Sequence, residues 1–573
     1  MKRRILAFLL SGCLLVNNID ISVWASVQDM ESNNLAETGE KVIEETDTPD
    51  DSGEENSTSF QETESGEEEQ QEKETEEIHK TEGNEDISGE ETGEDIPQTE
   101  ELPKEETSDL LEPTEKESMD VSAIPEKVIL ENESTAMTAE VTASDFQYSI
   151  LNGTYCTITG YSGTDTEITF PEQIDGYLVQ AIGDSVLKDN LSITKVTIPA
   201  CVETMGSAAF YGCTNLKEIV INAGLISIPD SAFYNCKSLE TVNIPETVKS
   251  IGNSVFEQCD NLKTINFSEG LESIGNNTFK NCVNLTRLEF PDSVVQIGQN
   301  VFQGSSLESV KLPANWTEVS GYPYESPFCG SGLKEVEIPQ GMAELPQNAF
   351  NGLESLEEIV IPEGMVRIGN NAFRDCINLK TAVLPESLSE IGDSAFYNCA
   401  GLTEINLPES VTVIEGSAFR GCSGLGSIRI PSGVKELMGY SFYDCSGLRE
   451  VILPEGLEKI GDRVFYNCSG LTEVDLPDSV KEMGQNVFDG CSSLESVKLP
   501  LNWTAVTGYP YESPFQGSSL KRVEIPEGMA AVPENAFKSA ENLEEVIFPE
   551  GLVRIGNNAF RDCINLKTAV LPE

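Results

Sequence analysis

The feature that most constrains the fold of this 573-residue chain is a repeat with a period of 23 residues. It is visible when residues 379–401 (LKTAVLPESLSEIGDSAFYNCAG) are set against residues 448–470 (LREVILPEGLEKIGDRVFYNCSG). From position 199 to position 572, the repeat prolines, or Asn222 and Ser268 in their place, are 23 residues apart, except for one step of 22 and two of 26. A period of this length predicts a solenoid in which each repeat forms one coil.

The consensus of the repeat, L-x-x-I-x-I-P-x-x-V-x-x-I-G-x-x-A-F-x-x-C-x-x, indicates how each coil folds. Its apolar residues before the proline alternate, as in a short strand, so Leu448, Val451 and Leu453 are expected to point inward. The proline ends the strand because it has no N–H for the ladder. Leu457 and Ile460 then line the opposite wall. We predict a repeat solenoid with one short parallel strand per coil and mostly irregular backbone elsewhere.

Two further registers of the consensus describe the core between the walls. A phenylalanine recurs from Phe210 to Phe560, and these rings are expected to form a stacked spine. The glycine after the second wall is replaced by Pro229, Pro346 and Pro533. Because proline fixes φ near −65°, this position is expected to need close packing rather than positive φ.

Cysteines occupy the register three residues after the phenylalanine in eleven coils. Disulfides are the first possibility in an exported chain. However, side chains at one register of adjacent coils are parallel, the number is odd, and Ser305, Leu353 and Ala540 replace cysteine in three coils. We therefore expect buried apolar thiols, with disulfides as the alternative.

Residues 1–25 have the layout of a secretory signal peptide. Lys2-Arg3-Arg4 precedes the apolar run ILAFLLSGCLLV, and small residues follow in VWAS, which places the cleavage after Ala25. A variant of this prediction takes Cys13 as a lipoprotein-type acylation site. No later stretch reaches the ~18 apolar residues of a transmembrane span. We expect a protein that is secreted or on the cell surface of a bacterium.

Residues 26–140 hold 40 acidic and 6 basic side chains and few aromatic ones. Such a segment cannot bury enough apolar surface to order, so a disordered acidic spacer is predicted. Residues 141–573 form the predicted solenoid, which stops one strand into a coil and is therefore expected to be truncated at its C-terminus. The net charge of −62 repels phosphates, which argues against a nucleic-acid partner.

Taken together, the L, I, P, IG, AF and C positions resemble the BspA-type leucine-rich repeat family of bacterial surface proteins. The resemblance covers about residues 147–573, and residues 148–187 resemble the capping first coil of that family. It implies an exported or surface-attached leucine-rich repeat solenoid. Some members of the family are adhesins for host matrix proteins or other cells. The resemblance implies no active site, so no catalytic residues are transferred.

The sequence also lacks the residue combinations of common active sites. Its single histidine, His79, lies in the acidic spacer, which excludes Ser-His-Asp, Cys-His and histidine-zinc arrangements from the repeats. No P-loop, dinucleotide fingerprint or EF-hand motif is present. Paired carboxylates for glycoside hydrolysis stay possible, but none stands out. We predict a protein that is not an enzyme and that needs no cofactor or metal.

One candidate binding surface is the outward register four residues after the first leucine of each coil. The core registers barely change between coils, whereas this register changes freely, although ordinary variation at an exposed strand position is the alternative. Val360 and Val383 form a small apolar patch within it. The candidate residues of this register are Lys311, Val360, Val383, Asn406, Arg429 and Ile452.

The second candidate lies in the two 26-residue coils, which contain the related stretches NWTEVSGYPYESPF (315–328) and NWTAVTGYPYESPF (502–515). Counting from the proline places Trp316 and Trp503 at a wall position of the core. The extra residues follow as a bulge, and exposed tyrosines there would suit a protein or sugar ligand. A structural insertion is the alternative. The candidate residues of the bulges are Tyr322, Tyr324, Tyr509 and Tyr511.

These observations favour an exported leucine-rich repeat binding protein with an adhesin-like role. Its expected partner is a protein or glycan on the surface of a host or neighbouring cell. A passive structural role in a surface layer is the first alternative. A carbohydrate-active enzyme whose catalytic part is missing or unrecognised is the second.

Overall fold

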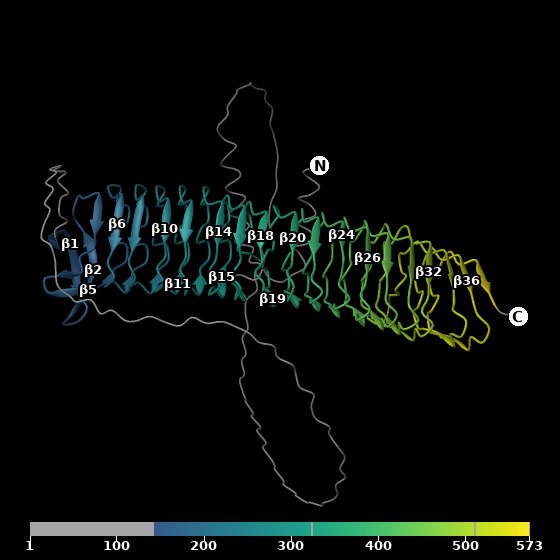
Figure 1. The fold of residues 1–573 in the computed structure, drawn as a ribbon. Coiled ribbons are helices and arrows are strands. Elements are labelled where there is room, and N and C mark those ends of the chain that lie inside the picture. Colours follow the sequence, from purple (N-terminus) through teal and green to yellow (C-terminus); the bar gives the residue numbers. More distant parts are fainter. Residues whose placement is uncertain (1–142, 322–324, 509–511, 572–573) are drawn as a thin grey trace, which may run out of the picture. The chain divides into compact units, whose positions relative to one another are not determined.

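The computed structural model describes residues 143–321, 325–508 and 512–571. These residues form a parallel β-solenoid of about 18 turns, with about 23 residues per turn. The coils stack one on the next from the blue strands to the yellow strands of the ribbon (Figure 1). The predicted fold class is therefore confirmed.

All described residues lie in one compact unit, Val128–Glu573. The predicted signal peptide and acidic spacer, residues 1–25 and 26–140, lie outside the described residues. They stay predictions.

The first coil closes the N-terminal end of the core. After the 3-10 turn η2 (Ala143–Asp145), the antiparallel hairpin of β1 (Phe146–Ile150) and β2 (Tyr155–Tyr161) pairs in parallel with β5 (Tyr177–Ile182), which also pairs antiparallel with β4 (Gln173–Ile174). The buried ring of Phe146 lies 5.4 Å from that of Phe170, which packs edge-on against Phe210. The hairpin therefore covers the apolar end that the first repeat would otherwise expose.

One wall, which we call the strand face, is a column of short parallel strands with one from each coil. In most of these strands the middle residue is buried and its two neighbours are exposed. Residues one repeat apart are paired, for example Val242 with Ile265. The strands of this column are β3 (Glu167–Thr169), β6 (Lys195–Ile198), β8 (Glu218–Ile221), β10 (Thr241–Asn243), β12 (Thr264–Asn266), β14 (Arg287–Glu289), β16 (Ser309–Lys311), β18 (Glu335–Glu337), β20 (Glu358–Val360), β22 (Thr381–Val383), β24 (Glu404–Ile405), β26 (Ser427–Arg429), β28 (Glu450–Ile452), β30 (Glu473–Asp475), β32 (Ser496–Lys498), β34 (Arg522–Glu524), β36 (Glu545–Ile547) and β38 (Thr568–Val570).

The opposite wall is also a column of parallel strands, although the sequence predicts only one strand per coil. Most of its strands are only two residues long, which is too short to show an alternation in the sequence. Leu457 and Ile460 are fully buried, as expected for this wall. The strands of the second wall are β7 (Thr204–Met205), β9 (Ser227–Ile228), β11 (Ser250–Ile251), β13 (Ser273–Ile274), β15 (Gln296–Gly298), β17 (Glu318–Ser320), β19 (Glu344–Leu345), β21 (Arg367–Ile368), β23 (Glu390–Ile391), β25 (Val413–Ile414), β27 (Glu436–Leu437), β29 (Lys459–Ile460), β31 (Glu482–Met483), β33 (Ala505–Val506), β35 (Ala531–Val532) and β37 (Arg554–Ile555).

Between the two walls, sixteen phenylalanine rings form one continuous stack from Phe210 to Phe560. Adjacent ring centroids are 5.1–5.8 Å apart, and adjacent ring planes lie within 24° of each other. Phe328 and Phe515, which end the two bulges, belong to the same stack. The core therefore keeps its spacing through both long coils.

The glycine after the second wall allows neighbouring coils to approach closely. A Cβ atom on Gly461 would lie 2.7 Å from the backbone nitrogen of Gly439 in the preceding coil, and one on Gly275 would lie 2.6 Å from the backbone of Gly252. Neither Gly461 nor Gly275 has positive φ. The expectation of close packing without positive φ is confirmed for these coils.

The repeated cysteines are free thiols, as expected, and bind the backbone of the preceding coil. Each Sγ–H donates to the carbonyl oxygen at the spine register one coil earlier, at 3.0–3.3 Å. Burial raises the pKa of Cys259 and of Cys422 to about 12. These thiols thus stay protonated and act as small apolar donors in the core.

The buried thiols should make the fold less stable in alkaline solution. Their folded pKa lies above the ordinary value of 9.0, so above pH 9 the unfolded chain releases protons that the folded chain retains. The resulting stabilisation is complete below pH 9 and is lost as the pH rises toward about 12, with a slope of about 1.4 kcal/mol per pH unit for each thiol. Urea unfolding at pH 8 and at pH 10.5 measures this loss.

Lysines and tyrosines also titrate in this range, so a matched variant is required. Replacing Cys399, Cys422 and Cys445 by alanine, the residue that the coil of Ala540 carries, should make the alkaline loss of stability shallower. If variant and parent lose stability equally between pH 8 and pH 10.5, the buried thiols are not the cause of the alkaline loss.

Candidate functional site

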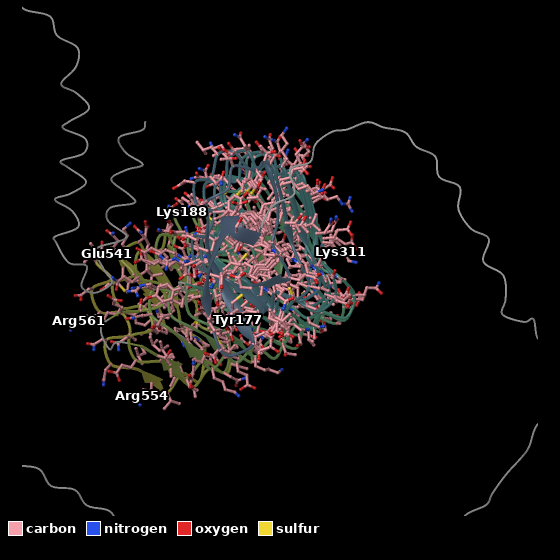
Figure 2. The ribbon with its side chains drawn as sticks, turned by 90° about the vertical axis from the view of Figure 1, so that its left-hand side faces the viewer. Tyr177, Lys188, Lys311, Glu541, Arg554 and Arg561 are labelled. Atoms are coloured by element: carbon pink, nitrogen blue, oxygen red, sulfur yellow. The ribbon has the colours of Figure 1, made fainter. Side chains whose placement is uncertain are left out.

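The candidate residues of the outward register all lie on the strand face. Lys311, Val360, Val383, Arg429 and Ile452 end the strands β16, β20, β22, β26 and β28, and Asn406 directly follows β24. Lys311 is half-buried, and the others are exposed. Viewed along the solenoid, Lys311 projects to one side and Lys188 to the opposite side (Figure 2). We call this register the strand-face column.

An apolar pair lies within the strand-face column. Val360 and Val383 are paired in register on neighbouring strands and are 63% and 55% exposed. Two coils further along, Arg429 is paired with Ile452, and its Nε lies 3.8 Å from a carboxylate oxygen of Glu409. The column therefore combines exposed apolar side chains with a cation, a mixture common at protein interfaces.

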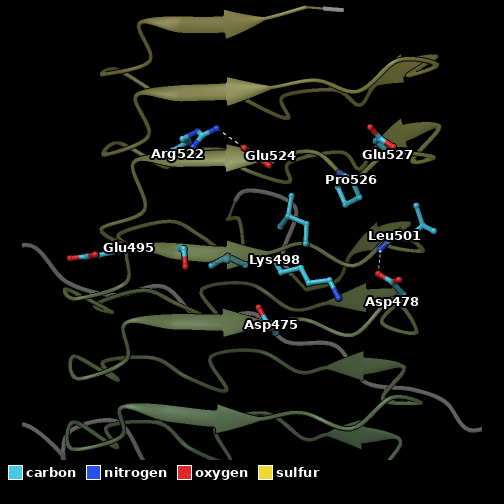
Figure 3. Close-up of a pocket in the computed structure, with 12 residues that line it drawn as sticks. Asp475, Asp478, Glu495, Lys498, Leu501, Arg522, Glu524, Pro526 and Glu527 are labelled. Atoms are coloured by element: carbon cyan, nitrogen blue, oxygen red, sulfur yellow. Dashed lines mark hydrogen bonds and ion pairs between the residues drawn. The ribbon is translucent and has the colours of Figure 1, made fainter.

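An open depression of about 610 Å³ lies further along the strand face, at residues that were not among the predicted candidates. It is lined by strand residues, including Lys498 and Arg522, and by Leu501 and Pro526 from the turns (Figure 3). β32 and β34 on its two sides belong to different sheets.

This depression accompanies the second 26-residue coil. The 26-residue spacing between Pro500 and Pro526 is the one sequence feature that coincides with the depression. This spacing alone does not produce a depression. In the first long coil, β16 and β18 remain paired over three residues. Asp475, Glu495, Glu524 and Glu527 line the depression together with its two cations, so its charge is mixed.

Trp316 and Trp503 are core residues, as predicted from their wall position. They are 1% and 2% exposed. Each indole N–H donates to a backbone oxygen two residues later at 2.9 Å, and each ring packs edge-on against a spine phenylalanine. Neither tryptophan can therefore stack on a ligand at the surface.

The bulge tyrosines Tyr322, Tyr324, Tyr509 and Tyr511 lie outside the described residues and stay predictions. The flanks of the two bulges are described and make the same contact with the preceding coil.

Asn300 donates to Glu325 at 2.7 Å, and Asn486 donates to Glu512 at 2.6 Å. Glu512 also lies 3.7 Å from Arg463. In the first copy, the corresponding position is Asn277. The two bulges thus have different surroundings despite nearly identical sequences.

In residues 143–321, 325–508 and 512–571, no group of three or more His, Cys, Asp or Glu side chains is arranged to hold a metal ion. Within the same ranges, no helix has the length and apolar character needed to cross a membrane.

The family profile of the BspA-type leucine-rich repeat region matches residues 180–308, 226–350, 295–426, 422–513 and 511–573. These overlapping matches cover more than half of the chain. The chain belongs to the BspA-type leucine-rich repeat family. Comparison with curated proteins gives no match.

Solved structures of other leucine-rich repeat proteins are similar to this BspA-type chain. A leucine-rich repeat protein from Bacteroides ovatus is 24% identical, with 75% of this chain and 98% of that chain covered and a TM-score of 0.46. A leucine-rich cell surface protein from Faecalibacterium prausnitzii is 24% identical over 75% and 93% of the two chains, with a TM-score of 0.27. The pneumococcal vaccine antigen PcpA is 20% identical over 72% and 96%, with a TM-score of 0.31.

Replacing either core tryptophan should affect stability and leave ligand binding unchanged. Trp503→Leu restores the residue common at this wall position but leaves a cavity, with an expected cost of about 2–4 kcal/mol. Urea unfolding measures that cost. Acrylamide should quench the emission of Trp316 and Trp503 only weakly in the folded chain, and a Trp24→Phe background removes the third tryptophan. Strong quenching in the folded chain would contradict the buried positions.

Proposed function

We propose that this BspA-type protein is a bacterial surface binding protein whose strand-face column contacts a protein on another surface. The main support for this proposal is that the inward registers are constant between coils, whereas the strand-face column varies. Inward positions hold the same residue types in coil after coil, while the outward column holds valine, asparagine, arginine, isoleucine and lysine. A surface that varies over a constant core is able to recognise one partner specifically.

The geometry of the strand face supports a protein partner. Parallel strands hold the column residues on a rigid backbone at about 4.8 Å per coil, so little ordering is required on binding. Val360 and Val383 supply exposed apolar area, and Arg429 supplies a guanidinium, which is enriched at binding hot spots.

Export and surface attachment belong to the same proposal. The basic, apolar and small-residue segments of residues 1–25 support export, and the acidic residues 26–140 suit a spacer that holds the repeats away from the attachment point. An adhesin-like role follows if the partner lies on a host or neighbouring cell.

The export proposal has a direct test in a bacterium that produces the full chain. The mature protein should begin at Ser26 and be recovered outside the cytoplasm, as N-terminal sequencing of the fractions would show. Changing Lys2, Arg3 and Arg4 to glutamate should leave the chain unprocessed in the cytoplasm. Cytoplasmic chain that retains Met1 in the parent would contradict export.

The binding proposal is tested by charge reversal along the column. The double variant Lys311→Glu with Arg429→Glu should lose at least about tenfold in affinity, the loss of roughly 1.4 kcal/mol expected for one interfacial charge. Binding would be measured against immobilised host matrix proteins and whole cells. The melting temperature should stay within about 2 °C, because Arg429 is exposed and Lys311 only half-buried, and such surface charges contribute little to stability.

A matched control carries the same charge change on the other wall. Lys435 and Arg554 are exposed next to β27 and in β37, and their double reversal to glutamate should leave binding intact. Equal loss in both double variants would point to a general charge effect. Intact binding in the column variant would exclude the strand-face column.

A further inference from the structure

A further ordered surface lies outside both the strand face and the second wall, along the turns that follow the second wall. It is formed by the residue that follows each spine phenylalanine. Arg561 occupies this register and Lys188 its counterpart in the first coil, and both project away from the side of Lys311 in Figure 2. In five consecutive coils the register reads Arg374, Tyr397, Arg420, Tyr443 and Tyr466. We call these five residues the ridge.

The ridge is a continuous stack of guanidinium groups and aromatic rings. The guanidinium of Arg374 lies 4.2 Å from the ring centroid of Tyr397, and that of Arg420 lies 5.5 Å from the same centroid. Arg420 also lies 4.4 Å from the ring of Tyr443, whose other neighbour, Tyr466, is stacked at 4.6 Å. All five side chains are half-buried. The flat faces of the rings and guanidinium groups are covered by their neighbours in the stack, and their outer edges are accessible to solvent.

Beside the ridge, two large side chains occupy a register that holds small residues in the other coils. The register two residues before the spine phenylalanine has positive φ in most coils and carries alanine, serine or asparagine there. Tyr440 and Arg463 take this register with φ of 64° and 54°. Such a backbone conformation is uncommon for large side chains and is retained where the surroundings require it.

Tyr440 and Arg463 complete a cluster around Arg420. Arg463 donates to the hydroxyl oxygen of Tyr440 at 2.8 Å, and the ring of Tyr440 lies 5.7 Å from the guanidinium of Arg420. Three rings thus surround Arg420. Over the described residues, Arg420 forms no ion pair, in contrast to Arg367, which binds the carboxylates of Glu344 and Glu390.

We infer that the ridge binds a glycan that carries isolated carboxylate groups among its hydroxyls, with Arg420 as the anchor for a carboxylate. This site is independent of the strand-face column. The stacked rings hold the guanidinium plane, so its outer N–H groups form a pre-organised fork for a planar carboxylate. Arg374, two coils away at roughly 10 Å, provides a second cation for the next acidic sugar.

The stack itself argues against a neutral sugar. A neutral ring would need an open aromatic face, yet Tyr397 is covered by arginines of the preceding and following coils, and Tyr443 by Arg420 and Tyr466. The ridge therefore presents N–H groups and tyrosine hydroxyls. Burial, and next the charge of Asp444, raise the pKa of Tyr443, so its hydroxyl remains a neutral donor.

Neighbouring carboxylates argue against an acidic peptide. Asp375 lies 3.3 Å from Arg374, and Asp444 accepts a hydrogen bond from Asn467 at 2.8 Å beside the stacked tyrosines. These groups would repel closely spaced anions but would accept hydrogen bonds from sugar hydroxyls. In a glycan with separated carboxylates, the carboxylates can bind the arginines of the ridge, and the sugar hydroxyls can donate to its aspartates.

The test is a titration of the full chain with a hyaluronan octasaccharide, in which every second sugar carries a carboxylate. Calorimetry should show saturable binding, and the same oligosaccharide with its carboxylates reduced to alcohols should not bind. Arg420→Gln and Arg420→Lys should each weaken binding at least about tenfold, because neither side chain provides a planar fork. Both residue types occur at this register, as Gln303 and Lys280, so the variants should fold.

The matched control is Lys435→Gln, which removes one positive charge from the second wall and should leave this affinity unchanged. A sialylated oligosaccharide, titrated in parallel, distinguishes a terminal carboxylate from one within a chain, and binding of either ligand supports the inference. The inference is overturned if neither binds, if reduced hyaluronan binds equally well, or if Arg420→Gln retains full affinity. Equal affinity for polyglutamate would assign the ridge to acidic peptides instead.

Discussion

Every coil of this solenoid depends on the apolar surface of the coils beside it. Ile368 is fully buried, and so are Leu345 and Ile391 at the same register of the coils before and after it. The strand of Ile368 pairs in register with the strands of both neighbouring coils, so it is covered from both sides. Burial is a property of the stack, as expected when each repeat contacts only its neighbours.

This dependence divides the residues of a coil into two groups. Inward registers must match from coil to coil, since each ring stacks on the next ring and each repeated thiol binds the carbonyl of the preceding coil. Outward registers meet no such requirement. Even a large side chain in the left-handed region, as at Tyr440, is accommodated there. Recognition can therefore change on the outside while the fold stays constant.

The sequence predicted the parts of the fold that the repeat itself determines. The proline period predicted the coils, and the alternation around Val451 predicted the strand face. Counting from the proline placed Trp316 in the wall, where the structure has it. The second-wall strands could not be predicted, because a strand such as Lys459–Ile460 is too short to show a period.

The candidate sites were less accessible from sequence, because they depend on contacts between coils. Arg463 and Glu512 are close in space but lie in different coils, so no local pattern relates them. A signal did exist at Tyr440 and Arg463, where large side chains replace the small residues of that register. The depression between β32 and β34 had a weaker signal, because the first long coil keeps its strands paired.

The electrostatics of the repeats explain why an arginine held by aromatic rings differs from the other cations. Eight lysines of the described residues bind a carboxylate at the same register of a neighbouring coil, as Lys380 binds Glu357 and Lys481 binds Glu458. Such exposed pairs contribute at most about 1 kcal/mol and neutralise each other locally, which leaves the repeats acidic. Arg420 instead has tyrosine rings as neighbours and keeps its charge available.

At physiological salt, charges further apart than roughly 8 Å are screened, so this local charge acts only at contact range. A densely charged polyanion must approach an acidic surface before it reaches Arg420. A ligand with a few separated anionic groups meets less repulsion. The acidity of the repeats therefore acts as a filter that favours sparsely charged ligands over dense ones.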